Sequence, residues 1–342
     1  MTIQFAEDFK GYGTDIAFML NGLYGQVSGA LVEDPDPNVT GNVFRATVNP
    51  TPGFRLRRVF TGARTTAGFC FRLWMENLPN TDRMVFGFLN GANARQVSIT
   101  SDSTGKIAVL RPDDTQIAIT ASPVLVANAW NHIEVRAVAS ATVGTIEIRV
   151  NGVTVLTANT LNTGTSYEQF CETAFGSSET ANYFIKDLVT WDGLGTRNND
   201  FLGTVQVIGR TPSSDVLTGW TPASGTSQFQ MINNSPPLDA TEYLTAPFPL
   251  PTPSSFGLSQ LPADTTSVKA MIVQSRVRNT DGGDGNFQAS LVSGAATGNG
   301  ANRPMTSAFT YYEDLFELDP NTAAAWTVAA ANAAVLRINR TV

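Results

Sequence analysis

Two alternating runs that lie back to back between residues 131 and 150 constrain the fold of this chain more than any other feature. In "HIEVRAV" (132–138), apolar Ile133 and Val135 alternate with polar residues, and "TIEIRV" (145–150) repeats the pattern. Alternation with a period of two is typical of a β-strand that has one face in the core and one polar face. A slip by one residue would turn the whole apolar row towards water, so the pattern specifies the register strongly.

Folding the two runs antiparallel around residues 140–143 places Arg136 opposite Glu147 and Glu134 opposite Arg149. We therefore expect two complementary ion pairs on the outward face. Each such pair contributes about 0.2–1 kcal/mol, which selects a register more than it adds stability.

Similar short alternating segments, bounded by Gly, Pro, Asn or Asp, recur throughout the first part of the chain, and helical periodicity is nearly absent. This pattern predicts two packed antiparallel sheets. The predicted strands are 42–47, 55–60, 67–76, 83–90, 95–100, 106–111, 115–120, 131–138, 145–150, 153–158 and 182–191.

Charged residues make up only 15% of the 342 residues, against roughly 25% in an ordinary soluble domain. The net charge is −7, with 18 arginines and four lysines. An acidic chain without a basic stripe argues against a nucleic-acid partner, and we interpret "RLRR" (55–58) as charge added to a strand end. No apolar run reaches the ~18 residues of a membrane span, and "MTIQFAEDFKGYG" at the start predicts no secretion signal.

The composition shifts at "DGLGTRNND" (192–200), which predicts a boundary between a domain at 1–195 and a second at 196–342. In the second part we expect a hairpin formed by 267–278 and 286–294. We also expect one short helix within 319–334, with Asp319 as its cap and Pro320 in its first turn.

The strings "AWNHIEVRA", "GTIEIRVNGVTV" and "YFIKDLVTWDG" resemble the laminin-G/concanavalin A-like jelly roll over roughly residues 1–192. "NNDFLGTVQV", "GWTPASG", "PPLDATEYL" and "YYEDLFELDPNTAAAWT" resemble a group of tailed-bacteriophage virion structural proteins. The expected fold class is all-β: a concanavalin A-like jelly-roll sandwich followed by a second, smaller β-sandwich domain with one short helix. The Pro-rich "PFPLPTPSSF" (247–256) departs from that group and is either a contact loop or a rigid connector.

Catalytic residues are not indicated. A glycoside hydrolase needs two carboxyl groups about 5–10 Å apart across a sugar-binding cleft, and the Glu-x-Asp-x-x-Glu strand of glucanases with this fold is missing. We interpret the acids of "VEDPDP" (32–37) as a solvated turn, and Glu313 and Glu317 as a structural strand face. His132, the only histidine, lies on the polar face at a strand start and is interpreted as structural; no Gly-x-Ser-x-Gly motif accompanies it.

Neither a metal nor another cofactor is expected. One histidine with two distant cysteines does not make a zinc site. Cys70 is interpreted as a small buried hydrophobe, and we expect Cys70 and Cys171 to stay reduced. Asp281, Asp284 and Asn286 in "TDGGDGN" could face a calcium ion, but their spacing matches no EF-hand loop, so a flexible hairpin tip is favoured.

The indole rings of the five tryptophans are candidate surfaces on which a sugar ring can stack. Trp74 and Trp130 are interpreted as core residues, and Trp326 as the residue that anchors the short helix to the sheet. Trp191 and Trp220 are weak candidates for a contact surface.

We therefore expect a non-enzymatic structural component of a phage virion, assembled in the bacterial cytoplasm and carried on the particle. Its expected partners are other virion proteins of the tail or capsid, further copies of itself in a homo-oligomer, and host cell-surface glycan. We favour a tail-associated fibre, spike or baseplate adhesion protein. A capsid decoration protein is the alternative, and a glycoside hydrolase acting on host polysaccharide is a third.

Overall fold

The computed structural model describes residues 3–9, 12, 23–24, 26–27, 30–35, 42–47, 53–78, 83–175, 182–234, 237–246, 252–280 and 285–341. The chain forms two compact units, Met1–Leu20 with Tyr24–Val207, and Asn21–Leu23 with Ile208–Val342. The division between the units therefore lies twelve residues beyond the predicted boundary at 195. Residues 192–200, predicted to be a linker, lie within the first unit.

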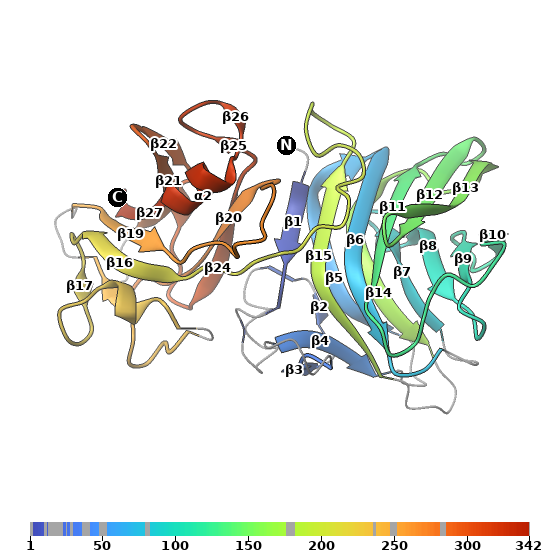
Figure 1. The fold of residues 1–342 in the computed structure, drawn as a ribbon, viewed down its shortest axis with the longest axis horizontal. Helices are drawn as coiled ribbons and strands as arrows, with labels where there is room; N and C mark the ends of the chain where they lie inside the picture. The colour runs from blue at the N-terminus through green and yellow to red at the C-terminus, as the bar shows by residue number, and fades with distance from the viewer. Residues whose placement is uncertain are drawn as a thin grey trace. The chain divides into compact units, whose positions relative to one another are not determined.

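The first unit is a sandwich of two antiparallel sheets (Figure 1). Sheet A has the order β13-β12-β11-β6-β15-β4-β3, and β1 pairs with β15 at the side of this path. Its strands are β13 (Val153–Leu161), β12 (Gly144–Val150), β11 (Asn131–Val138), β6 (Thr66–Met75), β15 (Asn182–Asp192), β4 (Asn42–Thr47), β3 (Ala30–Glu33) and β1 (Ile3–Glu7).

Sheet B has the order β10-β9-β8-β7-β14-β5-β2. Its strands are β10 (Gln116–Ile119), β9 (Ile107–Leu110), β8 (Arg95–Ser101), β7 (Arg83–Leu89), β14 (Tyr167–Phe175), β5 (Gly53–Arg64) and β2 (Gln26–Val27).

Aromatic rings fill the space between the two sheets. Phe69 of sheet A packs edge-on against Phe88 and Phe170 of sheet B, each with ring centroids 5.2 Å apart. The ring centroids of Phe71 in sheet A and Phe86 in sheet B are 4.4 Å apart. These interlocking rings fix which face of each strand points inward, because every second residue of a strand lies on the same face.

The predicted all-β sandwich is confirmed, and strands 42–47 and 131–138 have the predicted bounds. The antiparallel register of β11 with β12 is also as predicted, with Arg136 opposite Glu147 and Glu134 opposite Arg149. Four of the strands described in the first unit were not predicted: β1, β2, β3 and β14. In β14, "YEQFCETAF" mixes polar residues into both faces, so period-two alternation gives no clear signal.

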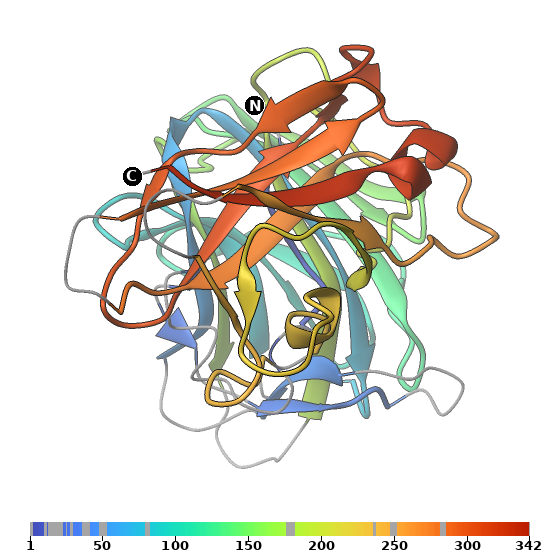
Figure 2. The same cartoon turned by 90° about the vertical axis from the view of Figure 1, so that its left-hand side faces the viewer.

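The second unit is a smaller β structure in which a six-stranded sheet has the order β16-β19-β27-β21-β22, with β23 paired to β21. These strands are β16 (Pro212–Leu217), β19 (Ser254–Leu258), β27 (Val335–Arg340), β21 (Asn286–Ser293), β22 (Ala296–Asn299) and β23 (Arg303–Pro304). Two-stranded pairs are β20 (Met271–Val277) with β24 (Thr310–Phe316), β17 (Thr221–Pro222) with β18 (Leu244–Thr245), and β25 (Leu318–Asp319) with β26 (Ala324–Ala325). The short helix α2 (Val328–Ala333) lies beside the large sheet (Figure 2), and a 3-10 turn η2 spans Phe229–Met231.

Two details predicted for the second unit are wrong. The strand at 271–277 does not form a hairpin with 286–293; β20 pairs with β24 instead, and β21 pairs with β27. The sequences of both strands alternate with a period of two, and this alternation does not indicate which strand each one pairs with.

The short helix is also displaced from its predicted start. Its N-cap is Thr327, whose hydroxyl accepts a hydrogen bond from the Ala330 N–H. Asp319 instead lies in β25, where its carboxylate accepts from the Asn321 N–H. Trp326 precedes the helix, is buried, and donates from Nε1 to the Phe316 carbonyl at 2.9 Å.

We expect Gly68→Ala to destabilise the first unit. A Cβ at this position would lie 2.2 Å from the Trp191 indole, which is buried and has little room to move. Overpacking of this kind typically lowers the free energy of unfolding by about 1–3 kcal/mol. Urea unfolding measures the loss, with exposed Thr157→Ala on β13 as the control. A Gly68→Ala protein as stable as that control would contradict the packing.

Candidate functional site

The outer face of sheet A, the face turned away from sheet B, carries most of the polar and aromatic candidates. On β6 the inward residues are fully buried apolar side chains, while Gly68, Cys70, Arg72 and Trp74 alternate with them on the outer face. The register with β11 places His132 opposite Arg72. On the outer face, the residues that lie opposite one another on β11, β6 and β15 form rows across the sheet.

Residues 193–207, which we call the connector, cross this outer face. The Leu202 and Gly203 N–H groups both donate to Glu134 Oε1, at 2.9 and 3.0 Å. The Val207 N–H donates to Asp187 Oδ1 at 2.8 Å. Glu134 is fully buried and Asp187 almost so, so these carboxylates replace water as acceptors for the connector's backbone.

Side chains of the connector add a second set of contacts. Phe201 packs against buried Trp191, with ring centroids 6.5 Å apart, and Arg149 lies 3.7 Å above the Phe201 ring centroid. Leu202 is also buried. The connector is thus a packed part of the first unit, and its Gly/Asn/Asp composition at 192–200 did not mark a domain boundary.

Burial raises the pKa of the Asp187 carboxyl to about 6, because the charged form loses its hydration. The Val207 N–H and the guanidinium of Arg72, whose Nε lies 3.2 Å from Asp187 Oδ2, act in the opposite direction. The desolvation effect is the larger of the two.

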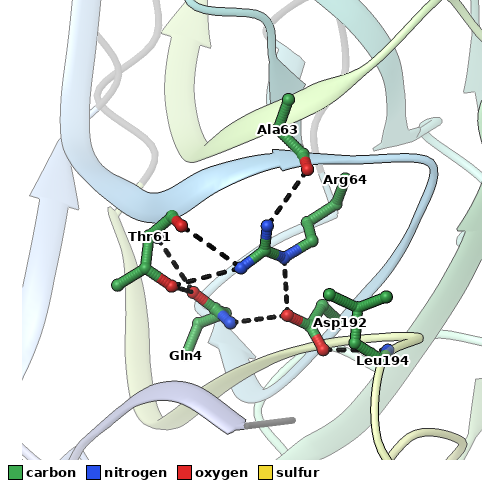
Figure 3. A network of polar contacts seen from close by, with 6 residues as sticks. All are labelled: Gln4, Thr61, Ala63, Arg64, Asp192 and Leu194. Atoms are coloured by element: carbon green, nitrogen blue, oxygen red, sulfur yellow. Dashed lines mark hydrogen bonds and ion pairs between the residues drawn. The ribbon is translucent and has the colours of Figure 1, made fainter.

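A third buried carboxylate, Asp192, lies where the connector begins (Figure 3). Its Oδ2 accepts from Arg64 Nε at 2.6 Å and from Gln4 Nε2 at 2.7 Å, and its Oδ1 accepts from the Leu194 N–H. Arg64 lies in β5 of sheet B, whereas Gln4 and Asp192 lie in sheet A. Asp192 therefore joins the two sheets and the connector in one polar network.

The two cross-strand ion pairs predicted between β11 and β12 do not form, although their register is correct. Glu147 pairs with Arg149 along its own strand, at 3.0 Å. Arg136 lies 3.6 Å from Asp200 of the connector. The connector therefore supplies an ion-pair partner to a side chain of this face. The periodicity of the strands cannot predict such a partner, because the connector lies outside the strands.

His132 lies on the outer face at the start of β11, as predicted, and is buried. Burial, with the nearby Arg72 charge, lowers the pKa of its imidazole to about 4, so the ring is neutral at pH 7. Within the part of the chain that the structure describes, neither ring nitrogen has a hydrogen-bond partner.

Beyond the connector, one end of the outer face presents Trp74 and Trp130. The two half-buried indoles pack edge-to-face, with centroids 5.8 Å apart. Lys186 Nζ lies 4.0 Å from the Trp130 ring centroid and donates to Asp34 at 2.6 Å. The prediction that these two tryptophans belong to the core is wrong, because they lie on the face turned away from sheet B.

Other sequence candidates have structural roles. Trp191 is buried against Gly68, so its role as a contact surface is contradicted; Trp220 is half-buried against the second unit's core. Asp34 of "VEDPDP" is a buried partner of Lys186 and not part of a solvated turn. "RLRR" lies inside β5, where Arg58 is buried 4.2 Å from the Phe5 ring centroid.

Cys70 and Cys171 are both buried and are not joined in a disulfide, and burial raises the pKa of the Cys70 thiol. Glu313 lies in β24 and Glu317 directly after it, whereas Asp314 between them is buried against Arg303. Asn286 begins β21. Asp281, Asp284 and residues 247–251 lie outside the described residues.

In the part of the chain that the structure describes, no three His, Cys, Asp or Glu side chains gather as metal ligands would. Within the same residues, no helix is long and apolar enough to cross a membrane.

No protein-family model and no curated protein sequence matches this chain. Solved structures similar to it include an endo-β-1,4-glucuronan lyase from the fungus Trichoderma reesei, with 14% identity, a TM-score of 0.38, and coverage of 56% of this chain and 95% of that one. A β-glucanase of Bacillus licheniformis has 14% identity and a TM-score of 0.37, over 55% and 96% of the two chains. The carbohydrate-binding module CBM66 from Bacillus subtilis has 9% identity and a TM-score of 0.34, over 50% and 96%. At these values the likeness carries nothing about activity.

We expect Glu134→Ala to release the connector. The variant leaves the Leu202 and Gly203 N–H groups without their acceptor, at about 1–3 kcal/mol for each buried group. Limited proteolysis followed by mass spectrometry should show faster cleavage within residues 196–207. Glu134→Gln keeps a carbonyl acceptor and serves as the control. Equal cleavage rates in both variants would mean that Glu134 does not hold the connector.

Asp187→Asn should change how stability depends on pH. Between the ordinary carboxyl pKa of 3.8 and the raised value of about 6, the folded wild type binds more protons than the unfolded chain. Its free energy of unfolding therefore falls as pH rises through this window, on the order of 3 kcal/mol in all. The variant lacks that contribution.

The stability of Asp187→Asn relative to wild type should thus rise between pH 4 and 6 and stay constant above pH 7. Urea unfolding at several pH values measures this difference. A difference that does not vary with pH would show that the pKa of Asp187 is not raised.

Proposed function

We propose that this chain is a non-catalytic structural protein of a tailed-phage virion, associated with the tail, whose first unit presents a surface to host glycan. The virion assignment rests on the resemblance of "NNDFLGTVQV" and "YYEDLFELDPNTAAAWT" to virion structural proteins. The non-catalytic role rests on the hydrogen bonds that the buried acidic side chains accept.

The observation that supports the non-catalytic role best is how the buried carboxylates of the first unit are used. Glu134 binds two backbone N–H groups of the connector, Asp187 binds a third, and Asp192 binds Arg64 and Gln4. A glycosidase needs two carboxyl groups that face a bound sugar, one to give a proton and one to act on the sugar or on water. These three carboxylates are instead committed to backbone and side-chain donors.

The second unit uses its acids in the same way. Asp215 accepts from the Gln228 and Phe229 N–H groups, and Asp314 accepts from the Ala301 N–H. Such bonds hold loops against a rigid framework. A framework that fixes its own loops suits a protein that assembles with neighbours through preformed surfaces.

The proposal predicts that the chain is a stoichiometric component of the particle. Mass spectrometry of gradient-purified virions should detect it in many copies, and cryo-electron microscopy should place it on the tail. Density on the capsid would replace the tail assignment by capsid decoration. Absence of the chain from purified virions would refute the virion role.

The same protein should leave host polysaccharide uncleaved. Size-exclusion chromatography of capsule or lipopolysaccharide after incubation with the purified chain should show no new oligosaccharides. Their appearance would refute the non-catalytic role and favour a glycoside hydrolase.

A further inference from the structure

The end of sheet A's outer face that the connector leaves uncovered combines half-buried aromatic rings with polar side chains in three successive rows. Glu76 and Asn182 form the first row, and Asn182 Nδ2 donates to Glu76 Oε2 at 3.1 Å. The register places Trp74 opposite Phe184 in the second row and Arg72 opposite Lys186 in the third.

Trp130 is held in the second row by a specific loop anchor. Asn131 is buried, and its amide donates to the Val126 and Ala129 carbonyls, at 2.8 and 3.0 Å. Its side-chain oxygen, Oδ1, accepts a hydrogen bond from the Val126 N–H. This closed set of bonds fixes the loop before β11, so Trp130 is presented on a rigid framework.

We infer that this end of the face, centred on Trp74 and Trp130, is a binding site for neutral sugar residues of a glycan. Indole rings offer flat apolar surfaces against which the C–H face of a pyranose can pack, and they retain an N–H donor. The Trp130 Nε1 atom is itself buried, with no hydrogen-bond partner among the described residues, so the surface that Trp130 offers to a sugar is its apolar ring. The Asn182 amide and Glu76 carboxylate border the rings and suit sugar hydroxyl groups.

The preference for neutral sugars follows from the charge balance. Among the described residues of these rows and their immediate partners, three are acidic and three basic. The acids are Asp34, Glu76 and Asp187, and the bases are Arg45, Arg72 and Lys186.

The two cations of the third row, buried Lys186 and half-buried Arg72, already have anionic partners. Lys186 bonds to Asp34 and Arg72 lies beside Asp187, and neighbouring His132 is neutral at pH 7. A uronic acid or a phosphorylated sugar would meet no uncommitted cation in this row, and it would lie near Glu76. Hydroxyl groups carry no such penalty.

This inference deepens the proposed function and rests on it only for the source of the glycan. Affinity electrophoresis of the full chain through gels containing dextran, mannan or laminarin tests it, with alginate and hyaluronan as acidic polymers. We expect at least one neutral polymer to retard the wild type. Trp74→Ala should weaken that retardation at least tenfold, and Trp130→Phe and Asn182→Ala should each weaken it by a smaller factor.

Tyr243→Ala removes an exposed aromatic ring from the second unit and is the matched control. Circular dichroism checks folding; if Trp74→Ala does not fold, Asn182→Ala and Trp130→Phe decide. Retardation by acidic polymers alone, no retardation at all, or variants that bind like the control would each overturn the inference. If the chain is found in virions but binds no polymer, the sugar site is overturned and the virion role stands. If the chain binds sugar but is absent from virions, the virion role is overturned and the sugar site stands.

Discussion

The hydrogen bonds from connector backbone to the buried carboxylates of Glu134 and Asp187 are the interaction on which the rest of the first unit depends. Three N–H groups of the connector point at these two side chains. A buried N–H group without an acceptor is strongly unfavourable, as is a buried carboxylate without donors. Each group therefore makes the burial of the other possible, and together they convert a polar strand face into an interior surface.

This arrangement explains why the outer face of sheet A has two different ends. Where the connector crosses, Phe201 and Leu202 cover the sheet, and Trp191 and Cys70 become fully buried. At the other end, Trp74 and Trp130 stay half-buried. The same strands therefore contribute a second, smaller hydrophobic layer at one end and a surface available for contact at the other.

Much of the framework could be predicted from alternation, because strands of a sandwich with one buried face repeat with a period of two. The bounds of β11 and its register with β12 followed directly from "HIEVRAV" and "TIEIRV". The role of the outer face could not be predicted in this way, because residues that alternate away from the core are expected to face water. Glu134 and Trp191 are fully buried there because the connector packs on them, and its composition resembles that of a linker.

The second unit shows the same limit. Alternation indicates strands at 271–277 and 286–293, and their proximity in sequence predicts that they pair with each other. In the structure β20 pairs instead with β24, across more than thirty residues. The alanines predicted a helix in the correct region. The capping bond of Thr327, and the participation of Asp319 in a strand pair, decided where it begins.

Amide hydrogen exchange tests the central claim most directly, because it reports on the N–H groups that the carboxylates bind. If the connector is part of the sandwich, the amides of Leu202, Gly203 and Val207 should exchange as slowly as those of β11 and β15. Exchange at the rate of a free linker would contradict the account.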